Sequence, residues 1–276
     1  MIGPGLLGGS ILKAVRQFQP ECELRIWARR VEVLEVIRGD GLADVATDDL
    51  ADAVEGADLI VLAMPIQFME GVVARFPELK KGCVVTDVGS TKASVVATLE
   101  GTVEGLGALF VGSHPMAGSE KTGIEHASAD LFVGAPVIVT ADSGCDSARR
   151  VAAFWETVGG RVSFMNPEEH DSVVASISHL PHLLASALVL STLRANPAQA
   201  NYSGGGFRDT TRIASGDPEM WTGIMLDNQA ALLSSLDDMI QELANWREAL
   251  AALDKDEVHR FLSAAKECRD KINQRG

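Results

Sequence analysis

The sequence predicts an α/β domain with a doubly wound, mainly parallel sheet, followed by an all-helical domain. In the first 166 residues, short apolar runs of strand-like composition alternate with helical patterns, which is typical of a buried parallel sheet. After Pro167 the pattern is almost entirely helical, with breaks at residues 195–207 and 215–220. We therefore predict two domains, residues 1–166 and residues 167–276, with the boundary near Asn166.

A glycine-rich turn opens the chain. In MIGPGLLGGSILKAV the three glycines follow the spacing G-x-G-x-x-G, and helix-like apolar spacing comes directly after them. The first glycine of such a turn allows a tight bend, the second lets the backbone approach a pyrophosphate, and the third lets helix and strand pack closely. The pattern predicts a Rossmann-type dinucleotide site. The residues expected in its phosphate-binding loop are Gly3, Gly5, Leu6, Leu7 and Gly8.

The strand that should precede this loop is reduced to Met1 and Ile2. Either the natural start lies upstream or the first strand is unusually short. Because that strand is normally central in this fold, a truncated strand would weaken the core.

Six further apolar runs have the composition of strands. They are ELRIW at residues 23–27, LIVLAMP at 59–65, CVVTDVG at 83–89, LFVGSHP at 109–115, APVIVTA at 135–141 and RVSFM at 161–165. A helix around residues 148–158 separates the last two.

The residues after the run 23–27 predict which cofactor is bound. NAD-specific sites usually place an acid here, where it holds the ribose 2′-hydroxyl. This chain has Ala28, Arg29 and Arg30, and its first acid after the run is Glu32. Two arginines would attract a 2′-phosphate, so we expect all three residues to contact the cofactor and NADP to be preferred, with NAD as the alternative. Arginines that only cap a strand on the surface are the competing interpretation.

Three polar clusters should lie at the carboxyl ends of strands, where open α/β sheets bind ligands. Ala63 and Pro65 belong to the first, GSTK at residues 89–92 is the second, and GSHPMAGSEKTG at residues 112–123 is the third. His114 follows LFV, so it should project into the crevice beside the nicotinamide. The alternative is a histidine that only caps the strand.

The helical domain adds two candidate motifs. In SHLPH, His179 and His182 lie three apart on one helical face. Such a pair can suggest a metal, but no third ligand follows at helical spacing, so we predict no metal site. In GGGFRDTTRIASGDPEMW, Arg208 and Arg212 are the obvious partners for an anion.

Taken in order, these motifs resemble the prephenate/arogenate dehydrogenase family of tyrosine biosynthesis. The resemblance covers nearly the whole chain and rests on GPGLLGGS, DVGSTK, GSHPMAGSEKTG, SHLPH and FRDTTRIASGDPEMW. It implies an NAD(P)-dependent oxidative decarboxylation of prephenate to 4-hydroxyphenylpyruvate, of arogenate to tyrosine, or of both. It also implies a homodimer formed through the helical domain.

The resemblance assigns roles to individual residues. It implies that His114 hydrogen-bonds the ring 4-hydroxyl with Ser90 beside it, and that Arg212 grips the ring carboxylate. The other residues that it places around the substrate are Ser119, Glu120, His179, His182, Asp209 and Trp221.

Composition excludes several other classes of partner. The net charge of −14 repels nucleic acid and anionic membranes at long range. The longest apolar stretch, residues 180–193, is too short and too polar for a membrane span, and no leader pattern begins the chain. The four cysteines lack CxxC spacing, which favours separate reduced thiols. We therefore expect a soluble, cytoplasmic protein that acts on a small molecule.

Two alternatives stay open at this level. Another two-domain reductase, of the 3-hydroxyacid dehydrogenase or pyrroline-carboxylate reductase type, would share the glycine motif, but no candidate catalytic lysine stands out near SHLPH. A protein that senses NAD(P) without turnover is the second, and the clustering of His114, Ser90 and Arg212 argues against it. The residues do not decide between prephenate and arogenate.

Overall fold

The computed structural model describes residues 1–118 and 121–273, and it divides into two compact units, residues 1–229 and 230–276. The predicted boundary near Asn166 falls where the first helix after the sheet begins, because the Asn166 side chain caps that helix by accepting the backbone N–H of Glu169 at 2.7 Å. The two-domain boundary itself stays a prediction.

The first unit is built on a twisted sheet in two parts. β1 (Arg25–Trp27) pairs in parallel with β2 (Val45–Thr47), a strand that the sequence did not predict. The other part has the order β3 (Leu59–Leu62), β4 (Val84–Asp87), β5 (Leu109–Pro115), β6 (Pro136–Thr140) and β7 (Arg161–Phe164). Ile2 joins the two parts through single parallel bridges to Trp27 and Leu62. This one buried residue therefore takes the place of the central strand.

One strand pair departs from the predicted parallel arrangement. β6 runs antiparallel to β5, with His114 opposite Ile138. A parallel return would need a crossover, usually through an α-helix. In the described part of this connection the chain forms only the short 3-10 helix η2 (Ile124–His126), so it folds back antiparallel. The parallel pairing of β3, β4 and β5 still brings the carboxyl ends of these strands to one edge.

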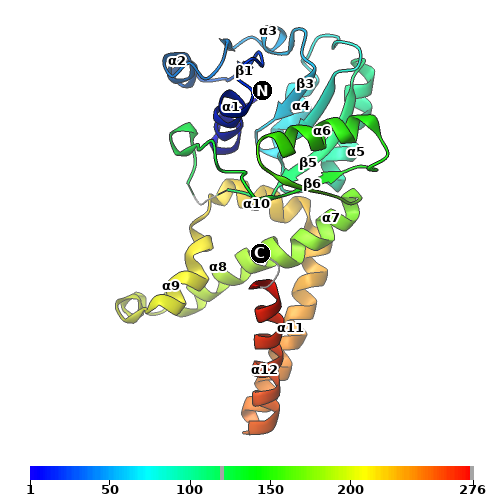
Figure 1. Ribbon diagram of the computed structural model, residues 1–276. Helices are drawn as coiled ribbons and strands as arrows, with labels where there is room; N and C mark the ends of the chain where they lie inside the picture. The colour runs from blue at the N-terminus through cyan, green and yellow to red at the C-terminus, as the bar shows by residue number, and fades with distance from the viewer. Residues whose placement is uncertain (119–120, 274–276) are drawn as a thin grey trace. The chain divides into compact units, whose positions relative to one another are not determined.

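Helices cover both faces of the sheet, which confirms the doubly wound fold (Figure 1). Because side chains alternate along a strand, Ile60 and Leu62 belong to one buried cluster while Val61 belongs to the other. The first cluster includes residues from α3 (Leu50–Val54), α4 (Met69–Val73) and α5 (Ala93–Gly105). The second includes residues from α1 (Leu6–Phe18) and α6 (Asp146–Thr157). A smaller cluster joins α2 (Val31–Gly39) to β1.

A long helical stretch follows the sheet. It consists of α7 (Pro167–Val174), a π-helical turn η3 (Ala175–His179) and α8 (Leu180–Leu193). Pro181, in the first turn of α8, has no N–H to donate to the preceding turn, and the wider π turn accommodates it.

By length and composition alone this stretch of 27 residues, which contains an 18-residue window with a mean hydropathy of 1.7, could cross a membrane. It carries His170, Asp171, His179 and His182, and all four are buried. We therefore interpret it as a helix that builds a site inside the fold. The predicted absence of a membrane partner and the cytoplasmic location stay predictions.

The remaining elements of the first unit are short. They are η1 (Ile66–Phe68) after β3, and then η4 (Pro197–Tyr202), α9 (Gly205–Thr211), η5 (Arg212–Ser215) and α10 (Pro218–Asp227) after α8.

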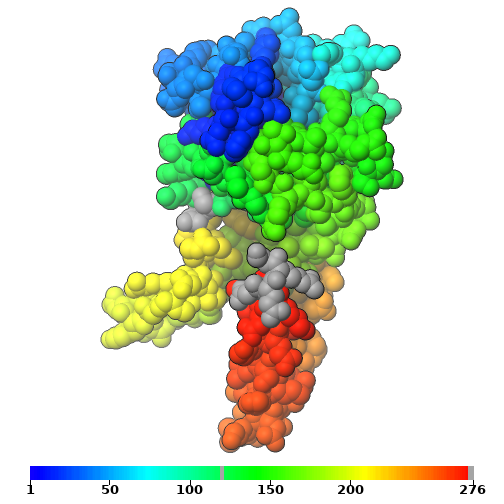
Figure 2. Space-filling view, viewed as in Figure 1, coloured from blue at the N-terminus to red at the C-terminus, as the bar shows by residue number. Residues whose placement is uncertain are grey.

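The second unit is a helical hairpin. α11 (Gln229–Ala251), whose first residue belongs to the first unit, and α12 (Lys255–Asn273) lie side by side, and Figure 2 shows them in orange and red. Trp246 packs on Phe261 with ring centroids 5.0 Å apart, and the Asp254 side chain caps α12 by accepting the backbone N–H of Glu257.

Candidate active site

The glycine loop has the geometry that a dinucleotide requires. A Cβ atom on Gly3 would lie 2.6 Å from the carbonyl oxygen of Ala63, and one on Gly8 would lie 2.0 Å from the carbonyl oxygen of Gly3. Close packing therefore demands glycine at both positions. Around Gly5, in contrast, a Cβ would meet nothing within 4 Å. This open space lies at the N-terminus of α1, where backbone N–H groups and the helix dipole favour a phosphate. The loop fits a bound NAD(P).

The other predicted cofactor residues surround this loop. Leu6 and Leu7 form the first turn of α1 and are half-buried. Beyond β1, Ala28 is buried, whereas Arg29 and Arg30 are exposed and lead into α2. Ala63 and Pro65 follow β3, the first half-buried and the second exposed.

A buried ion pair shapes the turn after β4. The Lys92 ammonium pairs with the Asp87 carboxylate, and both side chains are 0% exposed. Asp87 also accepts the backbone N–H of Gly89 at 2.8 Å and that of Ser113 at 3.2 Å. The pair thus ties the turn that carries Ser90, which is half-buried, to the neighbouring strand β5.

His114, near the end of β5, begins a hydrogen-bonded chain. Its Nδ1 atom lies 2.9 Å from Nε2 of His170, whose Nδ1 lies 2.8 Å from Oδ1 of Asp171. The Asp171 carboxylate also accepts the backbone N–H groups of Lys92 at 2.7 Å and Ala93 at 2.9 Å. His170 and Asp171 were not predicted from the sequence, because an acidic run after Asn-Pro looks like an ordinary helix start.

Asn228 extends the network to His179. Its Nδ2 atom donates to the Asp171 carbonyl oxygen at 2.8 Å and lies 3.2 Å from Nδ1 of His179. Because Asn228 supplies the hydrogen, a neutral His179 must carry its own proton on Nε2. That Nε2 atom is buried and has no hydrogen-bond partner among the described residues. It is a buried donor available to a ligand.

Trp221 contacts both histidines of the SHLPH motif. The rings of His182 and Trp221 stack with centroids 3.6 Å apart and planes 17° apart, while His179 meets Trp221 edge-on at 6.1 Å. Gly216 makes the stacking possible, since a Cβ there would lie 2.5 Å from Nε1 of Trp221. Within the described residues no group of three or more His, Cys, Asp or Glu side chains is placed to hold a metal ion.

Two of the remaining predicted substrate residues are exposed in the first unit. Arg212 is exposed in η5, an element that packs against α8. Asp209 is exposed in α9, where the neighbouring Arg208 lies 3.3 Å from the Ser203 hydroxyl. Ser119 and Glu120 lie outside the described residues.

Burial lowers the pKa of His114, His179 and His182. It lowers the pKa of His114 well below the ordinary value, and His170, Lys92 and His179 nearby lower it further. Burial also lowers the pKa of His179 to about 4 and lowers the pKa of His182. At pH 7 these rings therefore act as neutral donors and acceptors, and His114 is available as a base.

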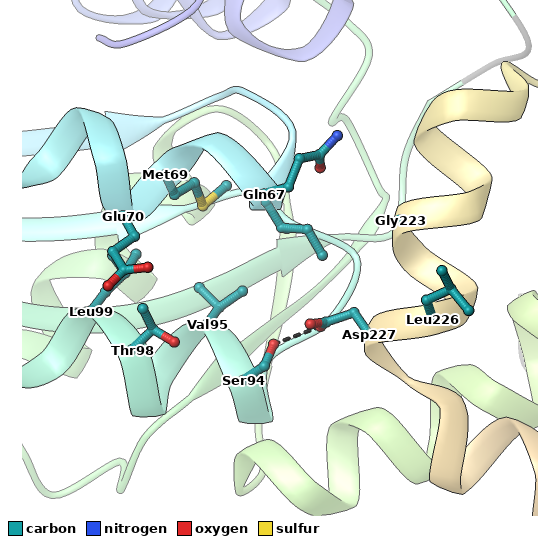
Figure 3. A pocket seen from close by; sticks show the side chains of 11 residues that line it. Gln67, Met69, Glu70, Ser94, Val95, Thr98, Leu99, Gly223, Leu226 and Asp227 are labelled. Carbon is teal, nitrogen blue, oxygen red and sulfur yellow. Dashed lines mark hydrogen bonds between the residues drawn. The ribbon is translucent and has the colours of Figure 1, made fainter.

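A cavity of about 430 Å³ lies elsewhere in the first unit, lined by residues of η1, α4, α5 and α10. Figure 3 shows Ser94 and Asp227 pointing toward one another, and the Ser94 hydroxyl donates to the Asp227 carboxylate at 2.6 Å. None of the predicted catalytic, substrate or cofactor residues is among its described lining residues. We therefore do not assign this cavity to the substrate.

Comparison with known proteins identifies the family. A family model for the nucleotide-binding domain of prephenate dehydrogenase matches residues 30–164, and a model for the dimerization domain matches residues 166–264. The cyclohexadienyl dehydrogenase of Zymomonas mobilis is 38% identical over 93% of this chain and 89% of its own length. The chain belongs to the prephenate dehydrogenase family. Membership confirms the resemblance inferred from the motifs.

Other proteins to which this chain is similar are also prephenate or arogenate dehydrogenases. The prephenate dehydrogenase of Bacillus subtilis is 32% identical over 98% of this chain and 74% of its own. The crystal structure of A. aeolicus prephenate dehydrogenase with hydroxyphenyl propionate and NAD+ has a TM-score of 0.89 at 32% identity, covering 98% of this chain and 96% of that one. Synechocystis arogenate dehydrogenase has a TM-score of 0.81 at 30% identity, covering 98% of both chains.

Proposed function

We propose that this chain oxidises and decarboxylates a cyclohexadienol, either prephenate, arogenate or both, with NAD(P) as cofactor. The observation that carries the proposal is a neutral, buried His114 at the carboxyl edge of the sheet that also carries the glycine loop. The names of the relatives support the substrate class, since they include prephenate, cyclohexadienyl and arogenate dehydrogenases.

The residues of the site have distinct tasks in this proposal. NAD(P) supplies the hydride acceptor when bound. His114 accepts the proton of the ring 4-hydroxyl as that oxygen becomes a carbonyl oxygen, and returns it to the phenolate oxygen that loss of CO2 leaves. Ser90 lies in the neighbouring turn. Arg212 binds the ring carboxylate, and the Nε2–H of His179 adds a neutral donor for the anionic substrate. In a chain of net charge −14, such local donors are needed to hold an anion.

The test is a comparison of four reactions, each substrate with each cofactor, followed by the absorbance of the reduced nicotinamide. We expect turnover with at least one substrate and formation of 4-hydroxyphenylpyruvate or tyrosine. No turnover in any of the four reactions would overturn the proposed function. The ratio of kcat/KM between the two substrates would show whether prephenate or arogenate is preferred.

NADP is the proposed preferred cofactor, because Arg29 and Arg30 are exposed at the position where NAD-specific sites carry an acid. Arg29→Ala should weaken use of NADP by about 10-fold or more, in line with ~1.5–3 kcal/mol for a hydrogen bond to a charged group, and should leave NAD nearly unaffected. The measurement is kcat/KM for both cofactors. Arg75→Ala, an exposed arginine after α4, is the matched control for the loss of charge. A parent protein that prefers NAD would contradict the proposal.

Arg212 is the proposed carboxylate partner. Arg212→Ala should raise KM for the dienol substrate by ~10-fold or more, since a guanidinium holds a carboxylate through paired hydrogen bonds. Arg208→Ala, four residues earlier in α9, serves as the control and should change KM little. An unchanged KM in Arg212→Ala, or a larger effect in Arg208→Ala, would show that another basic side chain binds the carboxylate.

A homodimer through the helical domain is the proposed assembly. The second family model is named for dimerization, and several large apolar side chains of α11 and α12 are exposed in the single chain. They are Leu233, Ile240, Leu243, Leu250, Leu262 and Ile272. Light scattering should give twice the chain mass of 29.3 kDa, and a mass equal to that of one chain would contradict the proposal.

A further inference from the structure

We propose that His170 and Asp171 are positioning residues that fix the tautomer of His114, so that its Nε2 atom is the one that accepts the substrate proton. The inference rests on the proposed function for its catalytic consequence. The hydrogen-bonded chain itself can be tested without turnover.

The hydrogen-bonded chain from His114 through His170 ends at Asp171. Its Oδ1 accepts the backbone N–H of Lys92 and its Oδ2 that of Ala93, both at the start of α5, where the helix dipole favours a negative charge. Burial alone would raise the pKa of this carboxyl, but the hydrogen bonds from His170, Ala93 and Lys92 outweigh it and lower the pKa. Asp171 is therefore an ionised group that can only accept hydrogen bonds.

The acceptor at Asp171 determines the protons on both imidazoles. Nδ1 of His170, 2.8 Å from Oδ1, must carry a hydrogen. We take this to be the only ring proton of His170, which leaves a lone pair on its Nε2. That lone pair lies 2.9 Å from Nδ1 of His114, which must then donate. The free lone pair of His114 is thus left on Nε2. The opposite tautomer of His170 would place two acceptors 2.8 Å apart in a site where His170 is 0% exposed.

This arrangement orients a base in the way that base-and-orienter pairs do in other enzymes. As the substrate O–H bond breaks, its electron pair stays on oxygen and the proton bonds to Nε2 of His114. The resulting imidazolium donates more strongly from Nδ1 to His170, and the Asp171 carboxylate beyond stabilises its charge. This compensates for burial and for the nearby Lys92 ammonium, which both disfavour a charged ring.

The first experiment is chemical rescue of His170→Ala. We expect kcat to fall by ~10²-fold or more, as for loss of base catalysis, with KM changed by less than about 3-fold. Added imidazole, which has one donor and one acceptor, should restore turnover, whereas 1-methylimidazole, which has no donor for Asp171, should not. Adding Asp171→Asn to His170→Ala should abolish the rescue. Glu169→Gln, in the same turn but exposed, is the control and should keep full activity.

Two results of this experiment would overturn the proposal. One is full turnover by His170→Ala without imidazole, and the other is equal rescue by imidazole and 1-methylimidazole. A merely structural role for His170 would produce neither the donor dependence nor an unchanged KM.

The second experiment reads the tautomer directly. In protein with ¹⁵N-labelled histidine, side-chain NMR should show His114 protonated on Nδ1 in the parent and a mixture of both tautomers in His170→Ala. A parent with His114 protonated on Nε2 would overturn the proposal. Because this measurement needs no substrate, it holds even if the dehydrogenase assays fail, so the two proposals can fail separately.

Discussion

Replacing His114 by asparagine is expected to lower kcat by ~10²-fold or more while leaving affinity for NAD(P) near that of the parent. Asparagine can still hydrogen-bond the ring hydroxyl, but its amide cannot take up the proton in the transition state. The change is small in volume, so the buried end of β5 should stay intact. Steady-state kinetics with saturating substrate and a cofactor titration would measure both quantities.

His259→Asn, an exposed histidine on α12, is the matched control and should keep the parent kcat. The sign of the pH effect follows from burial, which lowers the pKa of His114, so the ring is protonated only below the usual imidazole range of about 6.5. Activity should therefore persist to below that pH before it declines. A His114→Asn variant that retains most of its turnover would show that His114 is not the base.

The carboxyl edge of the sheet could be predicted because it follows from elementary rules. Strand-like runs ahead of Pro65, Ser90 and His114 imply parallel strands, and parallel strands bring their carboxyl ends together. The glycine spacing was equally informative, since Gly3 and Gly8 are at positions where a Cβ would collide with backbone. In these places local sequence and tertiary packing demand the same residue.

The second half of the site could not be predicted from periodicity. In an uninterrupted α-helix at about 100° per residue, positions nine apart point to opposite sides, so His170 and His179 would not share a face. The π turn η3 adds about one residue to the register and brings His179 back toward the side of His170. The pairing of His170 with His114 also joins residues 56 positions apart, a contact that only the packing of α7 against the sheet creates. The antiparallel β6 was missed because an apolar run does not itself show strand direction, and only helical patterns between runs indicate parallel pairing.

Lys92→Met is expected to destabilise the protein by ~3–5 kcal/mol, the usual cost of removing one partner of a buried ion pair. Methionine fills much of the volume of the lysine stem but leaves the Asp87 carboxylate, which is 0% exposed, without its countercharge. Denaturant unfolding would measure the loss. The matched control is Lys80→Met, which breaks the exposed pair with Asp58, whose side chains are 51% and 77% exposed, and should cost about 0–1 kcal/mol.

A double variant separates the lost charge pair from simple loss of packing. Asp87→Asn removes the uncompensated charge and keeps an amide oxygen for one of the two N–H groups, those of Gly89 and Ser113, that the carboxylate accepts. Asp87→Asn with Lys92→Met should therefore recover part of the stability lost by Lys92→Met alone. If the double variant is no more stable than Lys92→Met, the ion pair is not what holds this turn.

The pH dependence of activity should also change in Lys92→Met, because the Lys92 ammonium lowers the pKa of His114. Its removal should raise that pKa and move the acid limb of kcat/KM to higher pH, which would link the buried pair to the proposed base.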